Sequence, residues 1–178
     1  MSHFDVFGLS PSVDLDVKAL EEKYRALALQ NHPDRAAGAD AATRRKLAET
    51  TATLNEALKV LKDPVKRAFY LLKLRGVDLE NETLAAQQRM PLEFLEEVME
   101  RREALDEARR SKDVSRAQKM GEEVRALLAA ALAKARAALS KPAGDAAALA
   151  EATVEMGRVR YFTRYLEEVE AIEEEALQ

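Results

Sequence analysis

Residues 20–34 read LEEKYRALALQNHPD, and this stretch decides the fold of the first part of the chain. Leu20, Tyr24 and Leu27 are spaced four and three residues apart, so they form an apolar stripe along one face of a helix. The proline of the terminal tripeptide ends this helix, because proline disfavours the helical conformation in the residue before it. The stretch therefore predicts an amphipathic helix, capped by Asp14 or Asp16, that ends near residue 31 at a turn.

A second helix with a longer apolar seam follows this turn. Its apolar positions repeat with the spacing 4-3-4-3 and are Leu47, Thr51, Leu54, Leu58 and Leu61. Such a narrow seam suits antiparallel packing against the preceding helix. Asp63-Pro64 then starts a third helix, with Asp as the N-cap and Pro at the first helical position, and Gly76 closes it. Together with a single helical turn at residues 4–9, these patterns predict an antiparallel helical hairpin with short flanking helices over residues 1–76.

The remainder of the chain has longer helical patterns. Residues 77–90 lack strong periodicity and are interpreted as a linker or a short helix. Helices are expected from 91 to about 110, from 114 to 139, and from the cap Asp145 to about 175, separated by short breaks. Long helices with short connections favour an antiparallel three-helix bundle over residues 91–178. The sequence therefore predicts an all-α protein with two domains.

Composition supports this fold class and excludes several kinds of chemistry. Ala, Leu, Glu, Arg and Lys fill 107 of the 178 positions, a share typical of helical proteins. The chain contains no cysteine, which excludes a disulfide framework, a thiol nucleophile and cysteine ligands for zinc or an iron–sulfur cluster. With only two histidines, we expect no metal and no cofactor. No apolar run reaches the roughly 20 residues that cross a bilayer and no leader pattern opens the chain, so we expect a soluble, cytoplasmic protein without membrane contact.

The charge is divided unevenly along the chain. The net charge is −4, but residues 1–76 carry 13 basic and 10 acidic groups, whereas residues 77–178 carry 15 basic and 22 acidic groups. The halves therefore have net charges of +3 and −7, which suggests two surfaces for two different partners. Neither half has the strongly basic stripe that nucleic-acid binding usually requires, so no nucleic-acid partner is expected.

The tripeptide His32-Pro33-Asp34 is the motif that indicates function. His32 offers a donor and an acceptor, Asp34 a charged acceptor, and Pro33 restricts the conformation of the turn. Taken alone, the tripeptide fits a simple capped turn equally well. A catalytic His–Asp pair is disfavoured because no nucleophile or second ligand lies nearby, so we expect no catalytic residue and no enzymatic activity.

With its surroundings, the tripeptide resembles the J-domain, the module that activates DnaK-type ATP-dependent chaperones. The matching pieces are FDVFGL at 4–9, Leu20-x3-Tyr24-x2-Leu27, His32-Pro33-Asp34-Arg35, LNEALxxLxDP at 54–64 and Arg67-Ala68-x-Tyr70. This resemblance implies that the turn and the basic face of the helix before it dock on the ATPase domain of the chaperone. The residues that it assigns to docking are His32, Pro33, Asp34, Arg35, Lys18, Lys23 and Arg25. The alternative for each lysine and arginine is an ordinary solvated charge, whereas Phe7, Tyr24 and Leu54 are expected in the core.

The rest of the chain resembles HscB, the J-protein family of iron–sulfur cluster assembly. The pieces that carry this resemblance are YLLKLRGV at 70–77, LEExxExxExLDE at 95–107 and Arg160-Tyr161-Phe162. In that family the helical domain binds the IscU-type scaffold protein, which the J-domain delivers to HscA or a DnaK homologue. The resemblance implies an apolar scaffold-binding spot with an acidic rim, formed by Leu95, Met99 and Tyr161 with Glu96, Glu100 and Glu103.

Several alternatives remain open at this stage. Leu95, Met99 and Tyr161 fit ordinary bundle core as well, because Leu92, Val98 and Leu105 compete for the buried face, while Phe162 follows the apolar rhythm and is expected in the core. Glu96 and Arg101 are charged where HscB proteins often carry apolar residues, so the scaffold surface is expected to be smaller or shifted. The absence of a four-cysteine module and of a transit peptide points to a bacterial-type protein. The competing functions are a general J-domain adaptor for an unrelated client and a structural coiled-coil protein.

Overall fold

The computed structural model describes residues 1–31, 38, 40–81 and 90–177. Within these ranges the regular secondary structure is helical, which confirms the all-α prediction. The chain divides into two compact units, Met1–Leu71 and Leu72–Gln178. The sequence places the first boundary near residue 76, whereas the two units meet within the third of the predicted helices.

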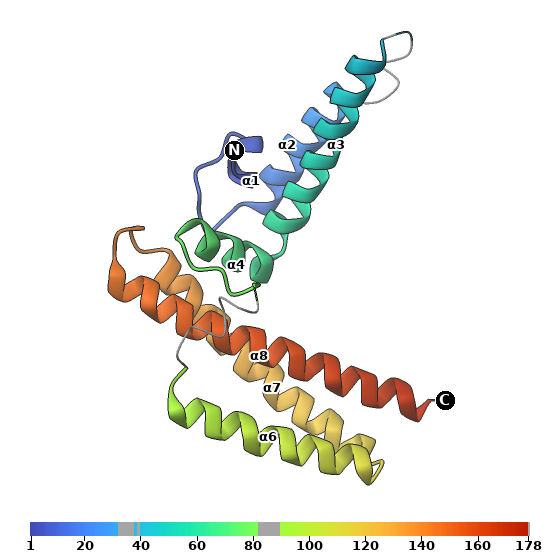
Figure 1. Ribbon diagram of the computed structural model, residues 1–178, viewed down its shortest axis with the longest axis vertical. Helices are drawn as coiled ribbons and strands as arrows, with labels where there is room; N and C mark the ends of the chain where they lie inside the picture. Colours follow the sequence, from blue (N-terminus) through green and yellow to red (C-terminus); the bar gives the residue numbers. More distant parts are fainter. Residues whose placement is uncertain (32–37, 39, 82–89, 178) are drawn as a thin grey trace. The chain divides into compact units, whose positions relative to one another are not determined.

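The first unit is an antiparallel helical hairpin with shorter helices at its sides. It contains α1 (His3–Val6), α2 (Val17–Gln30), α3 (Ala41–Lys62) and most of α4 (Pro64–Leu74). Figure 1 shows α2 and α3 side by side, and α1 also packs against α3. The carboxylate of Asp16 caps α2 by accepting from the backbone N–H groups of Lys18 and Ala19. Asp16, one of the two predicted capping residues, therefore starts α2.

Polar contacts fix the register of the hairpin along its length. The Lys62 ammonium donates to Glu21 at 2.7 Å, and this contact lowers the pKa of the Glu21 carboxyl. Further along, the Tyr24 hydroxyl donates to Asn55 Oδ1 at 2.8 Å. Because residue numbers rise on α2 as they fall on α3, the two helices run antiparallel and their apolar seams face each other.

Buried Arg67 explains one of the sequence motifs in physical terms. Its guanidinium donates to the backbone carbonyls of Val13 (Nε, 2.9 Å) and Leu61 (Nη1, 2.5 Å). Arg67 is only 4% exposed, so it joins the loop before α2 to the end of α3 from inside the unit. Three residues further, the Tyr70 hydroxyl accepts a hydrogen bond from the backbone N–H of His3 at 2.9 Å. The Arg67-Ala68-x-Tyr70 motif therefore connects α4 to the adjacent end of α3 and to two distant segments, α1 and the loop before α2.

We expect Arg67→Met to destabilise the first unit by about 3 kcal/mol, because two charge-assisted hydrogen bonds are lost and buried carbonyls lose a donor. Methionine keeps most of the buried stem, so the loss reports hydrogen bonding rather than packing. Hydrogen exchange of the first-unit amides in the full chain measures the effect. The exposed neighbour Lys66→Met is the matched control and should change stability by less than about 0.5 kcal/mol; equal effects of the two substitutions would contradict this role of Arg67.

The end of α4 confirms the predicted glycine cap. Gly76 has φ of +93°, its N–H donates to the carbonyl of Lys73 at 3.0 Å, and the N–H of Val77 donates to the carbonyl of Leu72 at 3.1 Å. This pair of bonds is the Schellman arrangement, which requires the left-handed conformation that glycine adopts without strain. Arg75 then donates to the carbonyl of Leu139 at 2.7 Å, so the residues after Leu71 are joined to the helices of the second unit.

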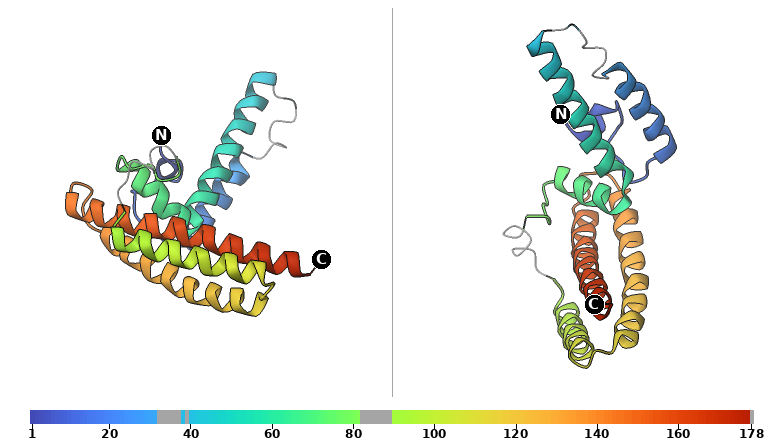
Figure 2. Two further views of the ribbon diagram at one scale, coloured as in Figure 1. Left: turned by 60° about the horizontal axis from the view of Figure 1, so that its bottom comes forward. Right: turned by 90° about the vertical axis from the view of Figure 1, so that its right-hand side faces the viewer.

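The second unit contains three long helices, as predicted. They are α6 (Leu92–Arg110), α7 (Val114–Leu139) and α8 (Ala146–Ala176). Figure 2 shows them as neighbouring helices, with α7 running opposite to the other two. Asp113 caps α7 and Asp145 caps α8 through backbone N–H groups, and Pro91 precedes the first residue of α6. The antiparallel three-helix bundle is therefore confirmed.

Small residues let α7 approach α8 closely. The buried residues of α7 are mostly small and comprise Ala117, Gly121, Val124, Ala131, Ala135, Ala138 and Leu139. At Gly121 an added Cβ would lie 3.1 Å from Cγ1 of Val169, which shows how little space separates the two helices. Larger side chains from α8, among them Met156 and Val159, fill the remaining core. The α7–α8 pair is thus the closely packed part of the unit, and α6 packs against it.

Candidate docking surfaces

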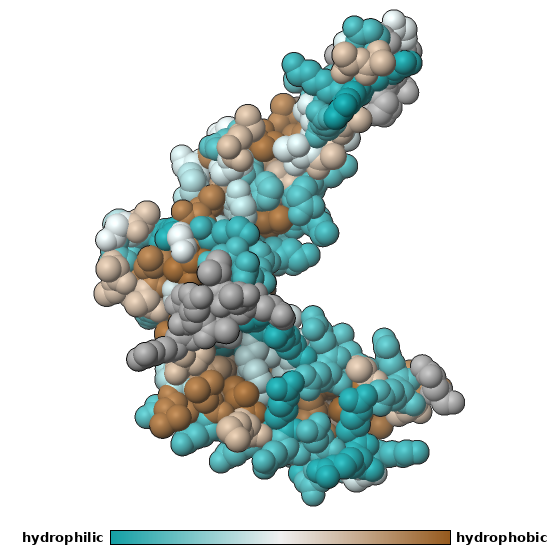
Figure 3. All heavy atoms as spheres, in the orientation of Figure 1, coloured by the Kyte–Doolittle hydropathy of each residue, from teal (hydrophilic) through white to brown (hydrophobic). Residues whose placement is uncertain are grey.

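The α6 helix exposes an apolar stripe with acidic neighbours. Leu92, Leu95 and Met99 are 70%, 44% and 65% exposed, and their spacing of three and four residues places them on one side of the helix. The exposed acidic residues beside them are Glu96, Glu100 and Glu103. Figure 3 shows apolar surface gathered over the N-terminal half of α6 and hydrophilic surface beyond it. An exposed apolar group of this kind with a charged rim is typical of a protein-docking surface.

The exposed fractions of Leu92 and Phe94 show which side of α6 is buried. The expectation that Leu92 competes for the buried face is wrong, because Leu92 is exposed and extends the stripe by one turn. The buried side is formed by Phe94 and Leu105, which are 5% and 2% exposed. The separation of eleven residues between them equals about three helical turns, so both side chains lie on the same side of α6.

Tyr161 lies between α6 and α8 instead of on an open surface. Its side chain is half-buried, its hydroxyl donates to the carbonyl of Val98 at 3.2 Å, and its ring meets that of Phe94 edge to face, with centroids 5.7 Å apart. Burial raises the pKa of the Tyr161 phenol. Its neighbour Phe162 is 3% exposed, which confirms the expectation that it belongs to the core.

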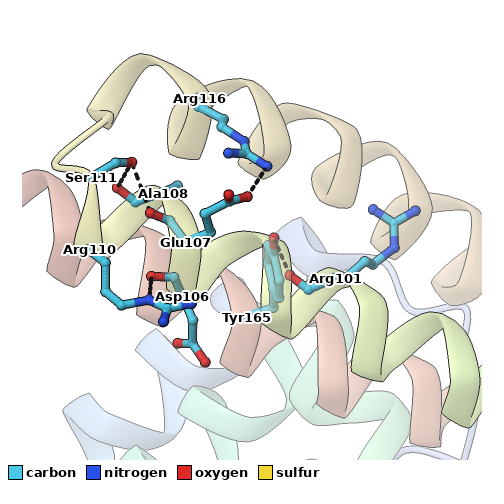
Figure 4. Close-up of polar contacts among 8 residues, drawn as sticks. All are labelled: Arg101, Asp106, Glu107, Ala108, Arg110, Ser111, Arg116 and Tyr165. Atoms are coloured by element: carbon cyan, nitrogen blue, oxygen red, sulfur yellow. Dashed lines mark hydrogen bonds and ion pairs between the residues drawn. The ribbon is translucent and has the colours of Figure 1, made fainter.

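A row of polar contacts continues along α6 and α8. The hydroxyl of Tyr165 donates to the carbonyl of Arg101 at 3.4 Å, which Figure 4 shows together with the contacts at the end of α6. Two ion pairs follow, Arg102 with Glu168 at 3.3 Å and Arg109 with Glu175. Each pair joins residues 64 to 66 positions apart in the chain, so α6 runs parallel to α8. The residues of α6 that make these contacts lie on one side of the helix, so the contacts fix its rotation and hence the direction in which its apolar stripe faces.

The connection from α6 to α7 is also fixed by polar contacts. Glu107 and Arg116 form an ion pair at 2.8 Å across the turn, and the Ser111 hydroxyl donates to the carbonyls of Glu107 and Ala108 (Figure 4). Lys112 adopts a positive φ of 54° in this turn. The stripe is therefore presented by a helix that is held both along its length and at its C-terminal end.

We expect Tyr165 to be the last tyrosine of the second unit to ionise, because burial raises the pKa of its phenol to about 12. An unfolded tyrosine ionises near pH 10, so unfolding releases this proton between pH 10 and 12. The contribution of Tyr165 to stability is therefore complete below pH 10 and is lost as the pH rises through 12. Tyrosinate absorbance, measured against pH for Tyr165→Phe and for the parent chain, tests this prediction. The substitution should remove the transition near pH 12. If it removes a transition near pH 10 instead, the prediction is contradicted.

On the first unit, two of the predicted basic residues share an exposed face. Lys18 and Arg25 lie seven residues apart on α2, close to two helical turns, and both are exposed. Glu22 lies between them on the same face, so this face is less basic than the sequence alone suggests. The Arg25 guanidinium lies 3.8 Å from Glu21 at the edge of the face, a distance at which an exposed pair contributes little stability.

Lys23 is placed differently from Lys18 and Arg25. It lies roughly 140° around the helix from Lys18, and its ammonium donates to the backbone carbonyl of Phe7 at 3.1 Å. Lys23 therefore holds the segment after α1 against α2. Phe7 and Leu54 are buried and Tyr24 is half-buried, in agreement with the core positions expected for them.

The predicted docking residues His32, Pro33, Asp34 and Arg35 lie outside the described residues. The helix ends on either side of them are anchored. The Asn31 side-chain amide donates to the carbonyl of Leu27 at 2.8 Å, and Asp40 accepts from the N–H of Thr43 at 2.7 Å as the cap of α3. This backbone hydrogen bond lowers the pKa of the Asp40 carboxyl.

Two further properties concern only the part of the chain that the structure describes. No group of three or more His, Cys, Asp or Glu residues in it has the arrangement needed to hold a metal ion. None of its helices combines the length and the apolar character that a membrane crossing demands.

Both units match known protein families. The DnaJ domain matches residues 2–70, and the HSCB C-terminal oligomerisation domain matches residues 90–170. A co-chaperone protein HscB homolog from Bordetella petrii is 48% identical over 107 residues, which cover 60% of this chain and 61% of that protein. A second HscB homolog, from Neisseria meningitidis serogroup A, is 39% identical over 126 residues, which cover 69% of this chain and 72% of that protein.

Solved structures agree over nearly the whole chain. The chaperone HscB from Vibrio cholerae has a TM-score of 0.74 and 29% identity, with 98% of this chain and 99% of that chain covered. The human co-chaperone HscB, at 24% identity and a TM-score of 0.79 over 96% of this chain and 81% of that one, shares the fold. A DnaJ domain followed by such a three-helix unit defines a J-domain co-chaperone. Within that class, the chain belongs to the HscB family.

Proposed function

We propose that this protein stimulates the ATPase of a DnaK- or HscA-type chaperone and delivers an IscU-type iron–sulfur scaffold protein to it, in the cytoplasm and without catalytic activity of its own. The first unit is assigned to the chaperone, through Lys18, Arg25 and the tripeptide at His32. The second unit is assigned to the scaffold. The observation that carries the proposal is the exposed stripe of Leu92, Leu95 and Met99 on α6, because a group of exposed apolar side chains marks a surface that another protein covers.

The acidic rim of the stripe supports a partner with basic residues at its edge. Glu96, Glu100 and Glu103 are exposed beside the apolar residues, so they add electrostatic attraction and selectivity around an apolar centre. Tyr161 supports this surface by holding α6 against α8 through its hydrogen bond to the carbonyl of Val98. Because its side chain is only half-buried, its exposed edge can also contact the partner. Among the docking charges of the first unit, Lys23 contributes indirectly, through its bond to the carbonyl of Phe7.

The coupling between the two units needs no conformational signal. A scaffold bound to the second unit is present at high effective concentration wherever the first unit has docked. The chaperone therefore meets its client at the moment when ATP hydrolysis is stimulated, and cluster assembly or transfer is assisted. A J-domain adaptor for an unrelated client is the alternative function, and it differs only in the protein that the α6 stripe binds.

The deciding experiment is an ATPase assay of the chaperone with this protein, in the presence and absence of an IscU-type scaffold, together with calorimetry of the scaffold on this protein alone. We expect stimulation by this protein, further stimulation with scaffold, and saturable scaffold binding. Stimulation without any scaffold binding would leave the general adaptor as the function. A chaperone that responds to neither would contradict the proposal as a whole.

A further inference from the structure

The N-terminal half of α6, residues 92–100, carries the apolar stripe and is held differently from the C-terminal half. A groove of about 300 Å³ lies between this half of α6 and the α7–α8 pair. Farther along, Arg102 and Arg109 join α6 to α8 through ion pairs. Within residues 92–100 the one buried side chain is Phe94, which is 5% exposed. Phe94 is therefore the side chain that anchors this half of α6 in the interior of the unit.

Three side chains of α8 surround the Phe94 ring. Tyr161 and Phe162 meet it edge to face, with ring centroids 5.7 and 5.9 Å away. The Arg158 guanidinium lies over the ring, 5.3 Å from its centroid, at a distance suited to a cation–π contact. Glu155 holds this guanidinium, because its Oε1 accepts from Arg158 Nη1 at 3.2 Å. A series of contacts therefore runs from Glu155 through Arg158 to Phe94 on α6.

The Glu155–Arg158 pair is not explained by its contribution to stability. Glu155 is 7% exposed in the interior of α8, and two buried atoms, its Oε2 and Nε of Arg158, have no hydrogen-bond partner among the residues that the structure describes. Such atoms cost free energy, and two apolar side chains in place of a buried ion pair are often as stable or more so. The two atoms are also closed to solvent, so no ligand reaches them. What an apolar pair would lack is a guanidinium fixed over the Phe94 ring.

We propose that Arg158, held by Glu155, is a positioning residue of the scaffold-docking surface on α6. By fixing the Phe94 ring, it sets where the N-terminal half of α6 lies. Leu95 follows directly in the chain, and Met99 lies about one turn farther along the same helix. The stripe is thus arranged before a partner arrives, so binding does not include the cost of ordering it. This inference rests on the proposed function for the identity of the partner, whereas the position of α6 is measurable without one.

Hydrogen exchange of the full-length protein without scaffold tests the position of α6. Arg158→Gln keeps a donor for Glu155 but removes the cation from the ring, so amides 95–100 should exchange about threefold to tenfold faster. Amides 102–110 and those of α7 should keep the parent rate. Arg158→Lys keeps a cation between Glu155 and the ring and should stay within about twofold of the parent chain.

The matched control for the loss of a positive charge is Lys119→Gln. Lys119 is exposed on α7 and does not line the groove, so its substitution should leave exchange along α6 unchanged. An unchanged exchange rate of amides 95–100 in Arg158→Gln would overturn the inference. Exchange of the α7 amides at the parent rate shows that each variant keeps its fold.

Calorimetry with an IscU-type scaffold tests the consequence for docking. Arg158→Gln should weaken scaffold binding about threefold to tenfold, because the stripe is no longer fully ordered before the scaffold arrives. If Arg158 acts through the ring, the same substitution in a Phe94→Leu background should weaken binding by less than about twofold further. Unchanged affinity of Arg158→Gln, or equal losses in the two backgrounds, would overturn the positioning role. A parent chain that binds no scaffold would overturn the proposed function, and the exchange experiment would still decide whether Arg158 positions α6.

Discussion

The substitution His32→Gln is expected to return the ATPase rate of the chaperone to its unstimulated value while scaffold binding stays unchanged. Glutamine keeps one donor and one acceptor but loses the imidazole ring and its fixed geometry. The helix ends beside the tripeptide are anchored through Asn31 and Asp40, so the substitution alters a short segment between fixed points. An ATPase assay with the chaperone, and calorimetry with the scaffold, measure the two effects separately.

The control is an exposed charge of the first unit outside the proposed docking set. Lys59 lies exposed on α3, so Lys59→Gln should leave stimulation as it is in the parent chain. A combined loss of ATPase stimulation and scaffold binding in His32→Gln would count against two separable surfaces. Full stimulation by His32→Gln would remove the tripeptide from the docking mechanism.

Most of the fold is predictable because its signals are local. Asp63-Pro64 starts α4, Gly76 ends it, and Asp145 caps α8 at the positions that residue chemistry alone predicts. Each of these signals acts on backbone groups within a few residues of its own position. The apolar spacing along α3 is a local signal of the same kind, and it correctly predicts that α3 packs in the helical hairpin.

The direction in which α6 faces could not be predicted from its sequence. Leu92, Leu95 and Met99 on one side compete with Phe94 and Leu105 on the other, and apolar spacing alone does not rank them. The choice is made by tertiary contacts, namely the hydroxyl bonds from Tyr161 and Tyr165 and the two arginine–glutamate pairs to α8. The position of Tyr161 in the interface between α6 and α8 also depends on tertiary contacts and could not be predicted from local spacing. Its neighbourhood depends on α6, more than 60 residues away in the sequence.

Buried Glu155 illustrates a second limit. It lies three residues before Arg158 on α8, a spacing that on an exposed helix would suggest an ordinary solvated pair. Its burial results from the way α6 and α7 meet α8, and a glutamate in a run of mixed residues carries no signal of that packing. The burial of Glu155, which is 7% exposed and pairs with Arg158, is therefore visible only in the structure.

The double substitution Leu95→Ala with Met99→Ala is expected to weaken scaffold binding at least about 30-fold. Burying a leucine or methionine side chain in an interface contributes roughly 1.5–3 kcal/mol, and the two side chains are 44% and 65% exposed in the protein alone. Because they are exposed, and because alanine favours helix, the stability of the second unit should not fall. Calorimetry with an IscU-type scaffold measures the affinity, and the ATPase assay without scaffold should give the parent rate.

Leu177→Ala is the matched control for the loss of exposed apolar surface. Leu177 is 88% exposed at the end of α8, outside the stripe, so its removal should leave scaffold affinity unchanged. Charge reversal at Glu100 separates the rim from the apolar centre: Glu100→Lys should slow association and reduce its dependence on salt, because a rim charge acts mainly on encounter. If the double alanine variant binds as tightly as the parent chain, the α6 stripe does not bind the scaffold, and the contact must be made by another face of the second unit.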